Sequence, residues 1–248
     1  MTKIADFSPR RYETLVRRTL DESTTFRACR PETRESLLVA ATVRPIVRGE
    51  SVDVRGQPVK SLRVLISGSL EVSMQAASGK RSVVWYLEPG QMQGLISVID
   101  GKAAIHDARA HSDGLLLEIP SATFLDALAR DPALMQAVLL TLCQRSRALY
   151  DVVAGEALLT LRGRIARMLL LLSKAYGRES DAGMQLSLKL SQDDLADMLG
   201  VTRQSINREL KTLQQGRIIT MAYSRITVLD LAALRRVTDV ENLDHPPD

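Results

Sequence analysis

The chain has 248 residues, of which 45% are hydrophobic and 25% are charged, and its formal net charge at pH 7 is +4. A chain of this size can bury one or two hydrophobic cores, and its charge content is too high for a protein embedded in a membrane. The first twenty residues, MTKIADFSPRRYETLVRRTL, are charged throughout and lack the pattern of a signal peptide, so we expect a cytoplasmic protein without a membrane partner. The two cysteines, Cys29 and Cys143, are too few for a disulfide framework or for a zinc site built from cysteines alone.

Short β-rich segments alternate with turn residues from Thr42 to Ile119. Leu62 to Ile66 is followed by Ser-Gly, for example, and Val83 to Leu87 is followed by Glu-Pro-Gly. Many short strands joined by regular turns predict an antiparallel barrel or roll. We therefore expect residues 1–130 to form an N-terminal helical segment and a β-roll.

A long helix is predicted after Asp131-Pro132, from Ala133 to about Gly155. Apolar side chains recur along it in a heptad-like stripe that only Arg145 interrupts, namely Met135, Val138, Leu142, Leu149 and Val152. Such a stripe either packs on its own domain or forms the seam of a two-fold homodimer. We assign residues 131–158 to a dimerisation helix, and we interpret Cys143 as a small buried hydrophobe, the alternative being a cross-link between two subunits.

Residues 191–213, SQDDLADMLGVTRQSINRELKTL, have the pattern of two short helices joined by a tight turn. Ser191 is suited to cap the first helix, Gly200 to end it, and Thr202 to cap the second. In the second helix, Ile206, Leu210 and Leu213 supply a buried stripe at spacings of four and three. This arrangement predicts a helix-turn-helix, a motif whose second helix enters the major groove of DNA.

The polar face of the second predicted helix carries Arg203, Gln204, Asn207 and Arg208 in its first two turns. Arg offers a bidentate fork to guanine, and Gln or Asn offers one to adenine, so these side chains suit direct base readout. The alternative is an ordinary amphipathic hairpin with a solvated polar face. The predicted DNA-binding residues are Ser191, Thr202, Arg203, Gln204, Asn207, Arg208 and Arg225.

Two further features favour double-stranded DNA as the partner. Ile218-Ile219 begins a strand-like run that turns at Ala222 to Arg225 and then resumes, which is the pattern of a wing with Arg225 near a phosphate. From Leu158 to Arg236 the chain has 13 Lys and Arg against 7 Asp and Glu, so its positive charge belongs to the C-terminal part. We therefore expect a winged helix-turn-helix DNA-binding domain over residues 159–248.

With these segments in place, the chain resembles the catabolite activator/FNR (Crp/Fnr) superfamily of bacterial transcription regulators over nearly its whole length. The specific matches are LISGSLEV at Leu65 to Val72, GKRSVVWYLEPGQ at Gly79 to Gln91 and LRGRIARMLLLLSKAYG at Leu161 to Gly177, together with the helix-turn-helix. The resemblance implies an α+β protein, a homodimer on a palindromic operator, a roll that senses a small signal, and RNA polymerase as a further partner. It also implies base contacts from Arg203, Gln204 and Arg208. The catabolite activator has an acidic residue in the middle position, so Gln204 leaves the preferred base open.

The sensor segment departs from the cyclic-nucleotide-binding pattern. Members that bind cyclic nucleotides have Gly-Glu after the Pro-Gly turn and Arg-Ser some ten residues later, whereas this chain has Gly94-Leu95 and Ile105-His106. A phosphate without its cation in an apolar pocket carries a large desolvation penalty, so we expect no cyclic nucleotide. The alternative is a ligand-responsive regulator with a shifted phosphate loop that uses Lys102 or Arg109. The residues assigned to the effector pocket are Leu95, Ile96, Val98 and Ile105, which leaves the effector unidentified.

We expect no cofactor and no enzyme activity. An iron–sulfur cluster of the FNR type needs four cysteines, and haem is not expected because no second ligand accompanies His106 or His111. The sequence contains no Walker loop, dinucleotide fingerprint or metal-binding His pair on a helix. One alternative remains: the roll binds only a ligand or a protein, and the helix-turn-helix no longer binds DNA.

Overall fold

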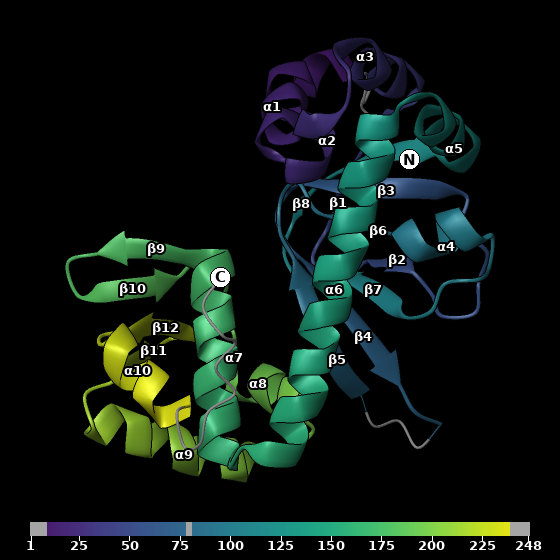
Figure 1. Cartoon of the computed structure of the whole chain (residues 1–248). Coiled ribbons are helices and arrows are strands. Elements are labelled where there is room, and N and C mark those ends of the chain that lie inside the picture. The colour runs from purple at the N-terminus through teal and green to yellow at the C-terminus, as the bar shows by residue number, and fades with distance from the viewer. Residues whose placement is uncertain (1–8, 78–80, 239–248) are drawn as a thin grey trace, which may run out of the picture. The chain divides into compact units, whose positions relative to one another are not determined.

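The structure is a computed structural model that describes residues 9–77 and 81–238 (Figure 1). The chain divides into two compact units, Met1–Ser146 and Arg147–Asp248, and the division falls within one long helix. No helix in the described ranges combines the length and the apolar character that crossing a bilayer requires.

The first unit begins with three helices and continues with a β-roll. The helices are α1 (Pro9–Glu22), α2 (Thr24–Ala28) and α3 (Pro31–Ala40). The strands and helices of the roll are β1 (Thr42–Ile46), β2 (Ser51–Asp53), β3 (Ser61–Ser67), β4 (Leu70–Gln75), β5 (Arg81–Leu87), β6 (Met92–Gln93), α4 (Leu95–Asp100), β7 (Asp107–Ala110), β8 (Gly114–Pro120) and α5 (Ser121–Arg130). The strands form two antiparallel four-stranded sheets, with the orders β1-β8-β3-β6 and β2-β7-β4-β5. The predicted antiparallel roll is therefore confirmed.

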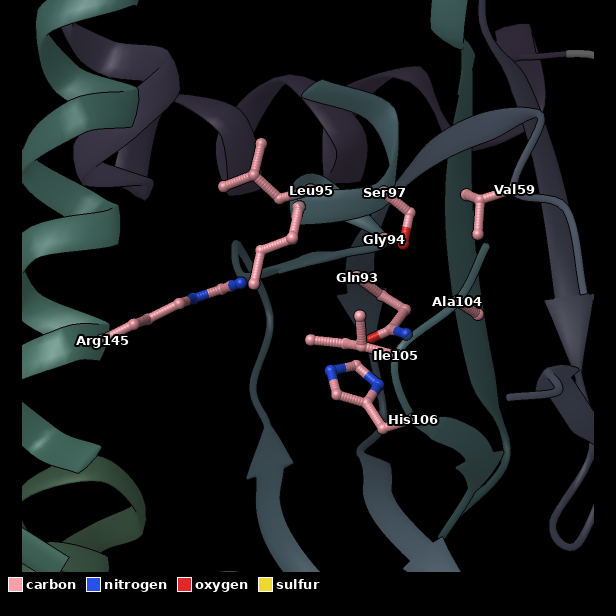
Figure 2. A pocket seen from close by; sticks show the side chains of 10 residues that line it. Val59, Gln93, Gly94, Leu95, Ser97, Ala104, Ile105, His106 and Arg145 are labelled. Carbon is pink, nitrogen blue, oxygen red and sulfur yellow. The ribbon is translucent and has the colours of Figure 1, made fainter. Parts of the chain in front are cut away.

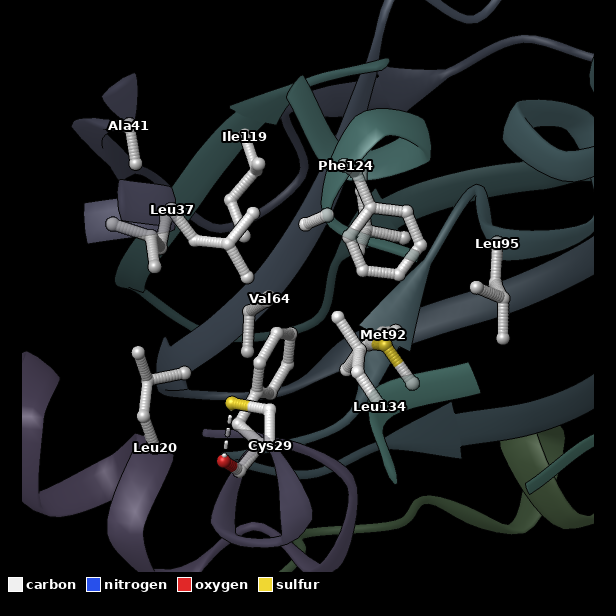
Figure 3. Close-up of a cluster of buried hydrophobic side chains, with 14 of the residues drawn as sticks. Leu20, Cys29, Leu37, Ala41, Val64, Met92, Leu95, Ile119, Phe124 and Leu134 are labelled. Atoms are coloured by element: carbon white, nitrogen blue, oxygen red, sulfur yellow. Dashed lines mark hydrogen bonds between the residues drawn. The ribbon is translucent and has the colours of Figure 1, made fainter. Parts of the chain in front are cut away.

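Strand β3 contributes to two hydrophobic cores because successive side chains point to opposite faces of a strand. Val64 and Ile66 belong to the larger core, which also includes Leu20, Leu37 and Phe124 from the helices (Figure 3). Leu65 belongs to a second, smaller core that draws on strands of both sheets. The larger core thus binds the helices to one sheet, and the smaller core lies between the sheets.

The turn after β3 requires glycine. Gly68 has a φ of +87°, and a Cβ atom there would lie 2.5 Å from the carbonyl oxygen of Asp113. A Cβ atom on Gly114 would lie 2.1 Å from the carbonyl oxygen of Ser67. The backbones of two chain segments therefore meet here at a distance that admits no side chain.

The second unit is built around the helix-turn-helix. Helix α6 (Pro132–Leu158) crosses from the first unit into it and is close to the expected Ala133 to Gly155. The elements that follow are α7 (Leu161–Tyr176), β9 (Gly177–Ser180), β10 (Gly183–Leu186), α8 (Gln192–Leu199), α9 (Arg203–Gln215), β11 (Ile219–Ala222), β12 (Arg225–Val228) and α10 (Leu231–Thr238). Their four strands form one antiparallel sheet in the order β11-β12-β10-β9. The sequence predicted the hairpin β11–β12 but not its partner hairpin β9–β10.

Glu88 makes the stability of the roll depend on pH. Burial raises the pKa of its carboxyl from 4.5 to about 7, because a desolvated carboxylate is disfavoured. Between these two pKa values the Glu88 carboxyl is protonated in the folded state and ionised in the unfolded state. The stabilisation is complete below the unfolded pKa and is lost as the pH rises through the folded pKa.

We predict that Glu88→Gln, which cannot ionise, flattens this dependence. Thermal melts from pH 4 to pH 8 should show a higher Tm than the parent at pH 8 and little difference at pH 4. An equal shift at both pH values would contradict the assignment of the effect to ionisation.

Candidate nucleic-acid interface

Helix α8 begins with a capping box. The Ser191 hydroxyl accepts a hydrogen bond from the backbone N–H of Asp194 at 3.1 Å, and the Asp194 carboxylate accepts one from the N–H of Ser191 at 2.8 Å. The helix ends at Gly200, whose φ of 65° lies in the left-handed region. These are the start and stop that the sequence indicated, so α8 is fixed at both ends by local chemistry.

Helix α9 begins at Thr202, whose hydroxyl accepts a hydrogen bond from the N–H of Ser205 at 3.2 Å. Ile206, Leu210 and Leu213 are each at most 1% exposed, so the predicted apolar stripe is the buried face of this helix. The opposite face of α9 is therefore left to solvent over its first two turns.

Three of the four predicted base-reading side chains, Arg203, Gln204 and Arg208, are exposed. Asn207 is half-buried, and its side-chain oxygen accepts a hydrogen bond from the Gln192 amide at 3.5 Å. Arg203 forms an ion pair of 3.2 Å with Asp193 of α8, and both side chains are 64% exposed. An exposed pair of this kind contributes little and can exchange for another acceptor at small cost.

Arg208 is oriented by Glu209, a residue that the sequence analysis did not assign. The Glu209 carboxylate accepts hydrogen bonds from Arg208 Nε at 3.2 Å and from Arg162 Nε of α7 at 2.9 Å. Desolvation alone would raise the pKa of Glu209, but the two arginines more than offset it and hold that pKa below its ordinary value. The only feature of the sequence that could have indicated this role of Glu209 is its place next to Arg208 on the predicted recognition helix.

The wing is a tight hairpin. Ala222 pairs with Arg225 across β11 and β12, which leaves Tyr223 and Ser224 as a two-residue loop. Their φ angles, 49° and 62°, are both left-handed, as in a type I′ hairpin turn. The side chain of Arg225 is exposed next to this loop, where the sequence analysis had expected it.

The roll covers part of the predicted dimer stripe on α6. Val138 is 1% exposed and belongs to the core of the roll, and Leu142 packs partly against that core. Val138 is therefore corrected, because the roll itself buries it. Leu142 is half-buried, so its place in a seam stays a prediction. Met135, Leu149 and Val152 are 38%, 56% and 51% exposed.

Other apolar side chains of α6 are also exposed. Leu139, Tyr150 and Val153 are 54%, 76% and 67% exposed, and with Met135 they recur at helical spacing along one face. Cys143 is exposed as well, so the interpretation of it as a buried hydrophobe was wrong. Cys29 is the buried cysteine, and its thiol donates to the carbonyl oxygen of Phe26 at 2.9 Å.

A small cavity lies in the first unit at the predicted effector segment (Figure 2). Leu95, Ile96 and Ile105 line it, as expected, whereas Val98 is 3% exposed and belongs to the core. Its volume of about 20 Å³ is little more than a single water molecule requires. Lys102 and Arg109, the two cations of the alternative interpretation, are exposed and do not line it.

The cavity is more polar than the sequence indicated. Arg145 reaches into it from α6, and its Nη2 donates to the carbonyl oxygen of Met92 at 2.7 Å (Figure 2). His106 also lines the cavity, and its Nδ1 is buried without a hydrogen-bond partner. Burial lowers the pKa of both side chains. The sequence analysis treated Arg145 only as an interruption of the stripe and therefore missed it.

His111, the other histidine considered for haem, packs its ring edge-on against Tyr86 with 4.7 Å between the ring centroids. Within the described residues, no group of three or more His, Cys, Asp and Glu side chains is placed to hold a metal ion.

The fold and the recognition surface together define a winged helix-turn-helix DNA-binding protein with a sensor-type β-roll. Residues 43–131 match the cyclic nucleotide-binding domain, and residues 163–237 match the Crp-like helix-turn-helix domain. The chain belongs to the Crp/Fnr superfamily of transcription regulators.

The chain is similar to several characterised regulators. The global nitrogen regulator of Synechococcus elongatus is 27% identical over 189 residues, which cover 75% of this chain and 85% of that protein. A CRP-like cAMP-activated global transcriptional regulator of Mycobacterium tuberculosis is 22% identical, over 76% of this chain and 84% of that protein. Among solved structures, FixK2 of Bradyrhizobium japonicum aligns with a TM-score of 0.73 and 19% identity, covering 82% of this chain and 99% of that one.

Proposed function

We propose that this protein is a homodimeric regulator that reads a palindromic operator through the N-terminal half of α9. The observation that carries the proposal is the exposed set Arg203, Gln204 and Arg208 on a helix whose opposite face is buried. Such a helix presents base-reading groups in its first two turns, the part that enters the major groove. A regulator of this kind works on the chromosome, so we place it in the cytoplasm, with RNA polymerase as a further partner.

The two arginines should act as base readers. Arg203→Ala and Arg208→Ala should each weaken operator binding by about 1–3 kcal/mol and relax the preference at one base pair, because each removes one bidentate fork. Glu209 keeps its bond to Arg162 in the Arg208 variant, so the fold should persist. The measurement is the affinity for a panel of single-base operator variants, with the operator first selected from random sequences.

Arg225→Ala is the matched comparison because it also removes a guanidinium group, but from the wing and not from α9. A phosphate contact carries no sequence information, so this variant should weaken all operators alike and flatten the salt dependence. If the two α9 variants behaved in the same way as Arg225→Ala, α9 would contact backbone rather than bases.

We infer that the dimer seam is the exposed face of α6 that carries Met135, Leu139, Leu149, Tyr150 and Val153. An exposed apolar stripe at helical spacing on a long helix favours pairing with a second helix. This face keeps Met135 and Leu149 of the predicted stripe and leaves out Val138, which the roll buries.

Leu139→Asp should convert dimers into monomers, because it would bury a carboxylate in the seam at a cost of several kcal/mol. Leu140→Asp is the control, since Leu140 is 56% exposed and Leu139 is 54% exposed, but the two lie about 100° apart around the helix. Sedimentation at micromolar concentration should show dimers for the parent and for the control only. If the parent sedimented as a monomer, the proposed dimer seam would be wrong.

We also propose that the cavity beside α4 is the effector site and that its ligand is not a cyclic nucleotide. The position for the ribose-binding carboxylate holds Leu95, and the position for the phosphate-binding arginine holds Ile105. The one cation at the cavity, Arg145, comes from a different element, the long helix α6.

Calorimetry should accordingly detect no binding of cyclic AMP or cyclic GMP at micromolar concentrations, and operator binding should not require either. A Kd below about 10 μM, equivalent to roughly −7 kcal/mol, would overturn this proposal and would show that the cavity opens around the phosphate.

A further inference from the structure

Arg145 brings a positive charge into the first unit without a carboxylate to balance it. Its guanidinium reaches the small cavity from α6, and within the described residues its one hydrogen bond is to the carbonyl oxygen of Met92, at 2.7 Å (Figure 2). Desolvation lowers the pKa of Arg145, and no described carboxylate opposes that shift. Because arginine stays ionised in proteins, a half-buried guanidinium of this kind costs free energy unless an anion accompanies it.

The carboxylate whose charge acts on the cavity, Asp53, is committed to other partners. Its Oδ1 accepts a hydrogen bond from Arg63 at 2.6 Å, and its Oδ2 accepts one from the side-chain amide of Gln93 at 3.0 Å. Asp53 is 7% exposed, so turning it toward Arg145 would break a buried ion pair. The counter-charge for Arg145 therefore has to come from outside the described chain.

His106 places a second unsatisfied group in the same cavity. Its Nδ1 is buried and has no hydrogen-bond partner in the part of the chain that the structure describes. Burial lowers the pKa of His106, and the charge on Arg145 lowers it further, so the ring is neutral at pH 7 and the two side chains interact. A neutral imidazole can donate from Nδ1, and a buried donor without an acceptor is costly.

The mouth of the cavity is apolar. Ile96 and Ile105 line it and are 38% and 43% exposed, and Val59, which also lines it, is half-buried. The enclosed space, about 20 Å³, holds little more than a single water molecule. A ligand that fits this shape places one polar atom inside, beside Arg145, and keeps its body against the isoleucines.

We propose that the ligand of this cavity is an organic monocarboxylate with a short apolar chain. Its carboxylate pairs with Arg145 and accepts a hydrogen bond from His106, and its chain lies against Ile96 and Ile105. The inference rests on the effector site proposed above and names the chemical class of its ligand. A carboxylate supplies the missing counter-charge through a charge-assisted hydrogen bond, and the apolar mouth favours an organic acid over an inorganic anion.

Calorimetry with hexanoate on the full chain, at constant ionic strength, tests the ligand class. Hexanoate should bind with a Kd below about 1 mM. Hexylamine has the same chain with the opposite charge and should not bind, and acetate, which lacks most of the chain, should bind at least about tenfold more weakly. The absence of hexanoate binding at about 1 mM, or equal binding of hexylamine, would overturn the proposal.

Arg145→Gln tests the residue that carries the charge. Hexanoate affinity should fall at least about tenfold, the size expected for losing a hydrogen bond between charged groups. The Tm should match or exceed that of the parent, because the variant removes a charge without a counter-ion. Arg147→Gln is the matched control, since Arg147 is an exposed arginine of the same helix, and it should bind hexanoate as the parent does. Equal binding by Arg145→Gln and the parent would overturn the proposal.

Ile105→Glu and Ile105→Gln give a second test at an exposed position, where substitution disturbs the fold least. The new carboxylate of Ile105→Glu would repel the ligand and pair with Arg145, so hexanoate should bind at least about tenfold more weakly to it than to Ile105→Gln. Equal affinities of the two variants would overturn the proposal. Binding of cyclic AMP with a Kd below about 10 μM would instead overturn the exclusion of cyclic nucleotides proposed above, whereas a failure of hexanoate alone would leave that exclusion standing.

Discussion

The carboxylate of Asp131 holds the start of α6 in place, and the packing of the first unit depends on where that helix begins. Asp131 is fully buried, and its oxygens accept hydrogen bonds from the backbone N–H groups of Arg30 at 2.7 Å, Ala133 at 3.0 Å and Leu134 at 3.3 Å. Desolvation opposes its charge, but these donors hold its pKa below the ordinary value. One side chain thus caps α6 and ties it to the link between α2 and α3.

This cap determines which residues of α6 face the roll. With the helix starting at Pro132, Leu134 and Val138 enter the core, and Arg145 on the same side of the helix reaches the small cavity. The side that carries Leu139 and Tyr150 remains exposed. The helix therefore has one face packed on its own domain and another that is exposed, and the proposed dimer seam lies on the exposed face.

The sequence predicted those elements whose signals are local. The roll strands, the caps at Ser191 and Thr202, and the buried stripe of α9 follow from turn residues, capping side chains and helical spacing, and they are confirmed. It could not separate the covered residues of the α6 stripe from the exposed ones, because Val138 and Leu149 both occupy seam positions of a heptad pattern and differ in what covers them. The roles of Glu209 and Arg145 were missed for the same reason: their partners are distant in sequence or are backbone atoms.

The charges around α9 explain how a folded surface can remain available to DNA. The exposed pair between Arg203 and Asp193 is weak in water, so a base or phosphate can replace the carboxylate with little loss. Arg208 differs, because its partner Glu209 is only 8% exposed and is also bound to Arg162. Glu209 therefore holds the Arg208 guanidinium in one orientation, although the Arg208 side chain is 74% exposed. A buried carboxylate between two arginines lowers the net charge of the surface but orients the Arg208 guanidinium, the group proposed to meet a base edge. Orientation before binding reduces the entropy lost on association, so the acidic residue favours specific readout even though it weakens the general attraction to phosphate.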